Sequence, residues 1–198
     1  MANITRLRKN LEASIKAKQF LLNDEVMLNR FSLAVDMVVK RYQAGGRIYI
    51  AGNGGSAADA QHLAAEFVSK LARDRDPLPA EALTVDSSIL TAIGNDYGFE
   101  LVFSRQLAGK ASTADVFLGI TTSGRSPNIL RALEQCRAMG VSSLIFTGGD
   151  GGPAAMLADH CVIAPGTLTS TIQEVHIVLA HTLCESVEVA IFGEPAQH

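Results

Sequence analysis

The spacing of apolar positions changes along the chain and predicts where helices give way to strands. Residues 5–22 place apolar side chains at four-residue steps among basic residues, which predicts an amphipathic helix. A second apolar stripe over residues 26–42 predicts another helix, ended by the glycine pair at 45–46. Two helices before the first strand are more than a doubly wound sheet needs, so we expect them to pack against another subunit.

Five short apolar runs follow, each bounded by glycine or polar residues. Continuous apolar runs of this length are typical of strands that are buried on both faces of a parallel sheet. The predicted strands cover residues 48–51, 81–85, 115–120, 142–147 and 161–164. A final helix is predicted to run from a cap at Thr169 or Ser170 to about Phe192.

The alternation of these strands with helices predicts an α/β fold of three layers, in which a five-stranded parallel sheet lies between two layers of helices. We expect the flavodoxin-like strand order 2-1-3-4-5. The chain is interpreted as a single domain over residues 1–198. It begins with a helical pair at 1–45, and the doubly wound core and the C-terminal helix occupy 46–198.

Composition limits the classes of partner. The 198 residues have a net charge of −3 and a pI near 5.9, which argues against nucleic acid or a membrane surface as the partner. The N-terminus has no apolar signal core and no run of 18 apolar residues occurs, so we expect a cytoplasmic protein. Cys136, Cys161 and Cys184 have no paired spacing, which is typical of core thiols in a reducing compartment.

The first candidate site follows the first predicted strand. The turn contains Asn53, Gly54 and Gly55, and Ser56 is expected to cap a helix over residues 57–67. A strand, a glycine turn and a helix N-terminus together bind anions, because free N–H groups and the positive end of the helix dipole point at the ligand. The ordinary alternative is a strand–helix connection that binds nothing.

Two proton-handling side chains lie on the same predicted helix. His62 and Glu66 are four residues apart and therefore share one helical face. An acid–base pair beside an anion site indicates chemistry on a phosphorylated substrate. The same spacing also occurs on solvated helix faces, where the two side chains interact only weakly.

A second candidate anion loop follows the third predicted strand. Residues 121–126 read TTSGRS, and Pro127 follows at the first helical position. Hydroxyls and backbone N–H groups match phosphate oxygens without requiring a basic residue, although an ordinary Ser/Thr-rich helix cap has the same composition. The expected strand order places this loop beside the first one, at the topological switch point of the sheet.

Four motifs stand in a fixed order along the chain. They are GNGGSAADAQH at 52–62, AIGNDYG at 92–98, TTSGRSPN at 121–128, and IQEVH with a later histidine at 172–181. Taken alone, AIGNDYG predicts a polar loop at 94–98, which is either a simple turn or part of a binding site. Together, the motifs resemble the sugar isomerase (SIS) domain family and, within it, the bacterial phosphoheptose isomerases. The resemblance covers essentially the whole chain.

The resemblance implies an aldose–ketose isomerase that converts sedoheptulose 7-phosphate to D-glycero-D-manno-heptose 7-phosphate through an enediol, in the first step of nucleotide-activated heptose biosynthesis for surface polysaccharide. Glu66 and His181 are then the catalytic pair, and one zinc ion per subunit is held by His62, Glu66, Gln173 and His181. The implied substrate-binding residues are Asn53, Gly54, Gly55, Ser56, His62, Glu66, Asn95, Asp96, Thr121, Thr122, Ser123, Ser126 and Gln173. The family commonly has Ser where this chain has Thr121, so the hydroxyl is kept.

The family is typically a homotetramer with its sites at subunit contacts. Gln173 and His181 are eight residues apart on one helix, or about 12 Å at 1.5 Å per residue, so the two side chains would struggle to reach one metal ion. We therefore hypothesise a composite site made by two subunits. Three alternatives stay open, namely a non-catalytic SIS adapter that binds the replication initiator protein, an isomerase of another sugar phosphate, and a sensor without turnover.

Overall fold

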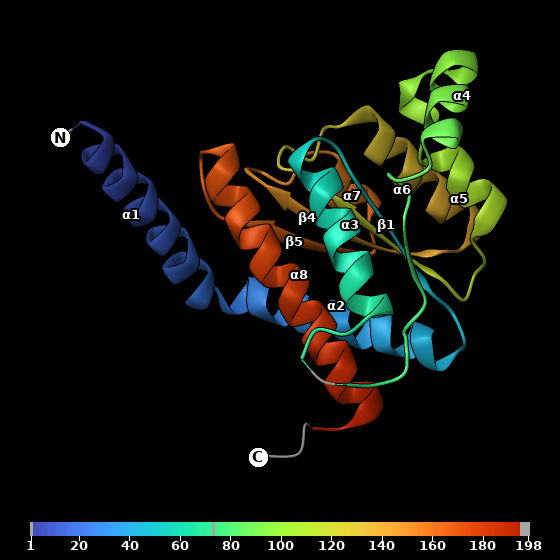
Figure 1. Cartoon of the computed structure of the whole chain (residues 1–198), viewed down its shortest axis with the longest axis horizontal. Helices are drawn as coiled ribbons and strands as arrows, with labels where there is room; N and C mark the ends of the chain where they lie inside the picture. Colours follow the sequence, from blue (N-terminus) through green and yellow to red (C-terminus); the bar gives the residue numbers. More distant parts are fainter. Residues whose placement is uncertain (1, 73, 195–198) are drawn as a thin grey trace.

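A single parallel sheet organises the fold. The computed structural model describes residues 2–72 and 74–194 (Figure 1). The strands are β1 (Ile48–Gly52), β2 (Ala80–Ala82), β3 (Val116–Ile120), β4 (Ser142–Gly148) and β5 (His160–Ala164). They are all parallel and lie in the order β2-β1-β3-β4-β5, so the predicted strand order is confirmed. Because β1 and β3 are neighbours in register, the loops that follow them start side by side.

Helices cover both faces of this sheet. In the described part of the chain they are α1 (Ala2–Leu22), α2 (Glu25–Gln43), α3 (Gly55–Val68), α4 (Ser87–Tyr97), α5 (Ser104–Lys110), α6 (Pro127–Met139), α7 (Ala154–Leu157) and α8 (Thr169–Phe192), with a 3₁₀ turn η1 (Phe99–Leu101). α2, α3 and α8 pack on one face, and α4 to α7 pack on the other. These are the three predicted layers.

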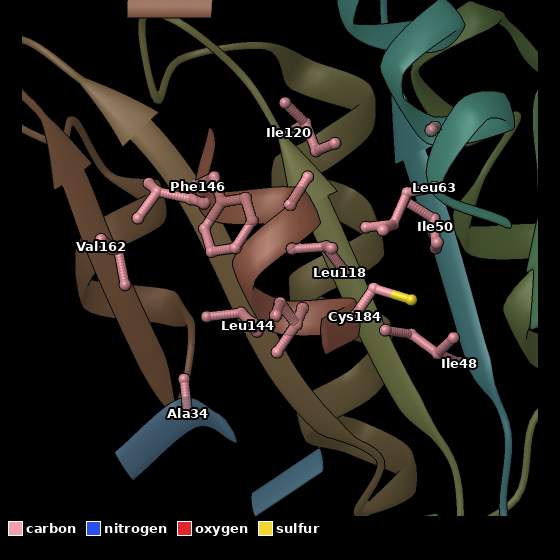
Figure 2. Close-up of a cluster of buried hydrophobic side chains, with 14 of the residues drawn as sticks. Ala34, Ile48, Ile50, Leu63, Leu118, Ile120, Leu144, Phe146, Val162 and Cys184 are labelled. Atoms are coloured by element: carbon pink, nitrogen blue, oxygen red, sulfur yellow. The ribbon is translucent and has the colours of Figure 1, made fainter. Parts of the chain in front are cut away.

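The strands contribute side chains to two separate cores. Ile48 and Ile50 point into the core beneath α2, α3 and α8, where Leu63 and Cys184 also lie (Figure 2). Tyr49, between them in sequence, belongs to the core on the opposite face. Every position of β1, β3 and β4 is therefore buried, which explains why these strands read as continuous apolar runs.

The cysteines are core residues, as predicted. All three are free and buried. Burial raises the pKa of the Cys136 and Cys184 thiols to about 12, so both remain protonated at neutral pH. Their side chains therefore act as small apolar groups.

Polar caps and glycine fix several helix boundaries. The Asp24 carboxylate accepts a hydrogen bond from the Met27 N–H at 3.1 Å, and Asp86 accepts one from the Ile89 N–H at 2.9 Å. Gly140 ends α6 in the left-handed conformation, with φ of 70°. These contacts set where α2 and α4 begin and where α6 ends.

Two of the predicted helix caps are wrong. α3 begins at Gly55, so Ser56 lies buried within its first turn, and Gly54 occupies the cap position with φ of 57°. Glycine adopts this conformation at little cost, which lets the helix start one residue nearer the strand. α8 begins at Thr169 itself, and neither Thr169 nor Ser170 is its N-cap.

The predicted polar loop at 94–98 is also wrong, because α4 continues through it to Tyr97. The turn preference of Asn and Asp suggested a loop. Leu90 and Ile93 instead pack against the core and keep this segment helical, and Gly98 ends it with φ of 94°. β2 is shorter than predicted as well, since it spans Ala80–Ala82 only.

α1 projects from the rest of the molecule (Figure 1). Several of its apolar side chains are exposed. Leu7, Leu11 and Ile15, the residues of its predicted apolar stripe, are 59%, 53% and 55% exposed. The amphipathic helix is thus confirmed, but this chain alone does not bury its stripe.

One helix in the described residues, α8, is long and apolar enough to cross a membrane by length and composition alone. Val175, Leu179 and Leu183 of this helix are buried against the sheet. Its apolar character therefore has the ordinary explanation that it is the central helix of its layer.

Candidate active site

α3 and α8 pack together and bring three of the predicted residues into one cluster. His62 Nε2 lies 2.9 Å from His181 Nε2 and 3.3 Å from Glu66 Oε1. One ligand atom from each residue lies within 4.8 Å of the other two. Glu66 and His181 are half-buried, whereas His62 is exposed. The cluster is therefore formed within one chain and open to small molecules.

The geometry of the cluster fits a shared proton or a bound cation. Two imidazole nitrogens 2.9 Å apart need a proton or a metal ion between them, because two facing lone pairs repel each other. Imidazole nitrogen and carboxylate oxygen are both ligands that zinc takes in proteins. The donor set thus fits zinc, and the same side chains provide an acid–base pair.

Gln173 lies about two helical turns before His181, beside the start of α3. Its side-chain amide packs so closely on Gly55 that a Cβ added to Gly55 would overlap Gln173 Nε2. Alanine at position 55 would therefore force the Gln173 side chain to move. α8 thus places Gln173 against the glycine turn and His181 beside His62.

The loop between β3 and α6 presents hydroxyl groups at a helix start. Thr121 Oγ1 and Ser126 Oγ lie 3.1 Å apart, and Ser123 Oγ accepts a hydrogen bond from the Arg125 N–H at 3.2 Å. Pro127 is the first residue of α6, as predicted. Hydroxyls gathered at the positive end of a helix suit a phosphate group.

A glycine-rich turn after β4 supports this hydroxyl loop. The Gly124 carbonyl accepts a hydrogen bond from the Ala154 N–H at 3.1 Å, and a Cβ at Gly152 would collide with that same carbonyl. A Cβ at Gly148 would likewise collide with the carbonyl of Thr122. The close packing of these glycines against the hydroxyl loop could not be predicted from the sequence, because it brings together segments that follow two different strands.

Asn128 is a further residue that sequence reasoning missed. Its side-chain amide and that of Asn53 exchange two hydrogen bonds, of 2.9 and 2.8 Å, across the gap between the two loops. Asn128 is 2% exposed, so the pair is shielded from water on one side. The signal was present, because Asn128 is the last residue of the TTSGRSPN motif. The prediction that the two loops lie side by side is therefore confirmed, and the Asn53–Asn128 hydrogen bonds connect them directly.

Asn95 and Asp96 lie on a different face. Both are exposed on α4, and Asn95 Nδ2 donates to Asp96 Oδ1 at 2.8 Å. Asp96 lines a hollow between α4 and α5 that also contains Arg105. α4 packs on the side of the sheet opposite α3 and α8. Their part in substrate binding stays a prediction.

Two other titratable groups lie near the cluster or the loops. Burial lowers the pKa of His176, whose Nε2 lies 3.0 Å from the Thr147 carbonyl oxygen, and keeps its imidazole neutral. Burial raises the pKa of Asp59, and the nearby His62 partly offsets this. Asp59 lies one turn before His62 on α3.

Comparison with known proteins identifies the family and agrees with the fold. The SIS domain matches residues 24–148. This match assigns the α/β domain to the sugar isomerase class. The chain belongs to the SIS domain family and, within it, to the phosphoheptose isomerases.

The second assignment rests on close relatives. A phosphoheptose isomerase from Aneurinibacillus thermoaerophilus is 49% identical over 94% of both chains, and one from Burkholderia pseudomallei is 46% identical over 96% of this chain and 97% of its own. A solved phosphoheptose isomerase from Francisella tularensis superposes with a TM-score of 0.90 at 34% identity, covering 94% of this chain and 98% of its own. The expectation of an isomerase fold and family is confirmed.

Proposed function

We propose that the protein interconverts sedoheptulose 7-phosphate and D-glycero-D-manno-heptose 7-phosphate. The observation that supports this most strongly is the cluster of Glu66, His62 and His181. Glu66 and His62 lie on α3, which starts at the first anion turn, and His181 comes from α8. The relatives named phosphoheptose isomerase support the identity of the substrate. The product would enter nucleotide-activated heptose biosynthesis.

The reaction needs one base and one acid. Glu66 removes a proton from C1 of the ketose, while His181 gives a proton to the carbonyl oxygen on C2, and an enediol forms. Deprotonation of the C1 hydroxyl and return of a proton to C2 then give the aldose. The Glu66 carboxylate and the His181 imidazole lie in one cluster, so the base and the acid can both reach the same end of the sugar.

The substrate phosphate is assigned to the loop between β3 and α6. Thr121, Thr122, Ser123 and Ser126 provide hydroxyl and backbone donors there, at the N-terminus of α6. Asn53, with Gly54, Gly55 and Ser56, borders the sugar from the neighbouring turn. The two hydrogen bonds between Asn53 and Asn128 hold the proposed sugar-binding turn and the proposed phosphate-binding loop at a fixed separation.

We also propose that His62, Glu66 and His181 hold one zinc ion per subunit, with Gln173 as a fourth ligand that the composite-site hypothesis takes from a second subunit, since Gln173 and His181 of one chain are about two helical turns apart. When bound, zinc supplies a Lewis acid that polarises the oxygens of the substrate. Glu66 then has two roles that compete, because a carboxylate that ligates a metal ion is a weaker base. The Gln173 amide is neither an acid nor a base at neutral pH, so it contributes a ligand oxygen or a hydrogen bond.

The protein is proposed to act as a cytoplasmic homotetramer. The exposed apolar stripe of α1, Leu7, Leu11 and Ile15, supports association with other copies. A groove of about 380 Å³ between α1 and the start of α8, lined by Phe20 and Leu168, would be covered by the same contact. Asn95 and Asp96, on the opposite face, would reach a substrate held by a second subunit.

The test is an NMR assay with sedoheptulose 7-phosphate, run with and without a zinc chelator. Wild-type protein is expected to form the aldose, and Glu66→Gln is expected to lose at least about a hundredfold in turnover, as when general base catalysis is removed. Wild-type protein that binds the phosphosugar without turnover would contradict the proposal and favour the adapter or sensor. Near-normal turnover of Glu66→Gln would reject the assigned base. The chelator decides whether the metal is needed.

A further inference from the structure

A buried ion pair joins the far ends of the two helices that form the catalytic cluster. Arg75 lies in the loop between α3 and β2, and Glu188 lies on α8. Arg75 Nη2 is 2.6 Å from Glu188 Oε1, and each side chain is only 1% exposed. No other ion pair among the described residues is buried to this extent.

The Arg75 guanidinium also caps the last turn of α3. It donates to the carbonyl oxygen of Glu66 at 2.9 Å and to that of Phe67 at 2.7 Å, two groups that the end of the helix leaves without an intrahelical partner. The Phe67 carbonyl also accepts the Leu78 N–H at 3.0 Å. A cation at a helix C-terminus is favoured by the helix dipole as well. Arg75 is therefore bonded directly to the backbone of the candidate base.

Glu188 accepts hydrogen bonds from the loop after α3 as well as from the guanidinium. Its two carboxylate oxygens accept the N–H groups of Leu71 and Ala72, at 3.1 and 3.3 Å. Arg75 Nη1 donates to the Asp76 carbonyl oxygen at 3.1 Å. The five N–H donors of arginine thus connect α3, the loop and α8 in one buried network.

The position of Glu188 on α8 relates this network to the catalytic cluster. Glu188 follows His181 by seven residues, or about two helical turns, so both face α3. The network therefore fixes how far α3 is shifted along α8, and this shift sets the separation of Glu66 from His181. A displacement of about 1 Å at reacting groups costs on the order of a hundredfold in rate.

We propose that Arg75 and Glu188 are positioning residues for the isomerisation, which hold the last turn of α3 against α8 so that Glu66 stays within reach of His181. The proposal rests on the proposed function, because its kinetic consequence requires Glu66 to act as the base. Neither residue touches the substrate in this arrangement. A change at either one should therefore alter turnover more than substrate affinity.

Arg75→Lys and Glu188→Gln are the test variants. Lysine keeps the positive charge but lacks the planar fork, so it cannot bond Glu66, Phe67 and Glu188 together. Glutamine keeps the size of Glu188 and one acceptor oxygen, and is the milder change. At a temperature where each variant is fully folded, we expect kcat to fall at least about tenfold and KM to stay within about twofold.

Leu107→Ala is the matched control for lost stability. Leu107 is fully buried on α5, in the core on the opposite face of the sheet, and its truncation leaves a cavity. This variant should melt at a lower temperature with kcat unchanged. If Arg75→Lys and Glu188→Gln also keep kcat within twofold while melting earlier, the pair is structural only and the proposal is wrong.

A crystal structure of the Glu188→Gln variant separates this proposal from the proposed function. We expect the last turn of α3 to move and the Glu66–His181 separation to change by about 1 Å. An unchanged cluster overturns the positioning role, whatever the activity. Wild-type protein that fails to turn over sedoheptulose 7-phosphate overturns the proposed function and with it the kinetic consequence, and the crystal structure then tests only whether the pair fixes the Glu66–His181 separation.

Discussion

At the scale of single residues, His176 shows how the fold sets a charge state. Its side chain is fully buried on α8, between the Phe146 ring and the end of β4. Nε2 lies 3.0 Å from the Thr147 carbonyl oxygen, and Nδ1 has no hydrogen-bond partner within residues 2–72 and 74–194. An imidazolium would leave a charged donor in an apolar core, so burial lowers the pKa and the ring stays neutral.

Mild acid is therefore expected to destabilise the protein through His176. Its pKa in the folded state lies below the ordinary value of 6.5, so the unfolded chain binds a proton that the folded chain does not. The contribution of His176 to the free energy of unfolding is fully present above about pH 6.5. It is lost as the pH falls below this value, by at most about 1.4 kcal/mol per pH unit. Urea unfolding at pH 7.5 and pH 5.5 measures the loss. His176→Gln should show a smaller loss than wild-type protein, and an equal loss in both would contradict the prediction.

Single residues were predictable where one element decides their position. The four-residue spacing of His62 and Glu66 on α3 placed both on one face, and the structure confirms it. The partner of Asn53 was not predictable in this way, because Asn128 comes from another helix and only the packed sheet brings the two amides together. Arg75 and Glu188 were missed for the same reason, being 113 positions apart in sequence.

At the scale of elements, the sequence predicted type and order better than boundaries. The apolar runs identify β1, β3 and β4 because both faces of these strands are buried. The end of α4 depended on packing instead, since Leu90 and Ile93 hold the helix against the core beyond the point where local turn preferences suggested a loop. Local residue preferences therefore indicate where a helix could end, and packing against the core determines where it does end.

The contact between α3 and α8 at Gly55 gives a prediction at this scale. In Gly55→Ala the new methyl group would overlap Gln173 Nε2, so the Gln173 side chain must move away while the helices keep their places. We expect turnover to fall at least about tenfold, as for a displaced catalytic group, with only a small change in melting temperature. Gly109→Ala on α5 is the control, because nothing lies within 4 Å of its added methyl group. Equal activity of the two variants would show that the position of Gln173 is unimportant.

At the scale of the whole molecule, one chain forms the cluster of His62, Glu66 and His181 but leaves Asn95 and Asp96 on the other face of its sheet. The sequence could predict that α1 has an apolar face. The expectation that another subunit covers that face stays a prediction, because hydrophobic periodicity records burial and not the identity of the covering surface. The composite-site hypothesis, which rests on the distance between Gln173 and His181, stays a prediction, and Asn95 and Asp96 are further residues that a second subunit would supply.

Charges placed in the stripe of α1 test whether assembly and activity depend on each other. In Leu7→Glu with Leu11→Glu, two carboxylates replace side chains that are 59% and 53% exposed in the single chain, so its fold should survive while contacts between copies are lost. Lys9→Glu, on the polar side of the same helix, is the charge control. Analytical ultracentrifugation should find smaller species for the double variant only.

The activity of those smaller species then decides the composite site. If a second subunit supplies Asn95 and Asp96, the double variant should lose at least about tenfold in specific activity, because substrate contacts across the interface are gone. Its loss should be partly reversed at high protein concentration, since association follows mass action. A dissociated variant with the full specific activity of wild-type protein would place the whole site in one chain, and the exposed stripe of α1 would then serve assembly alone.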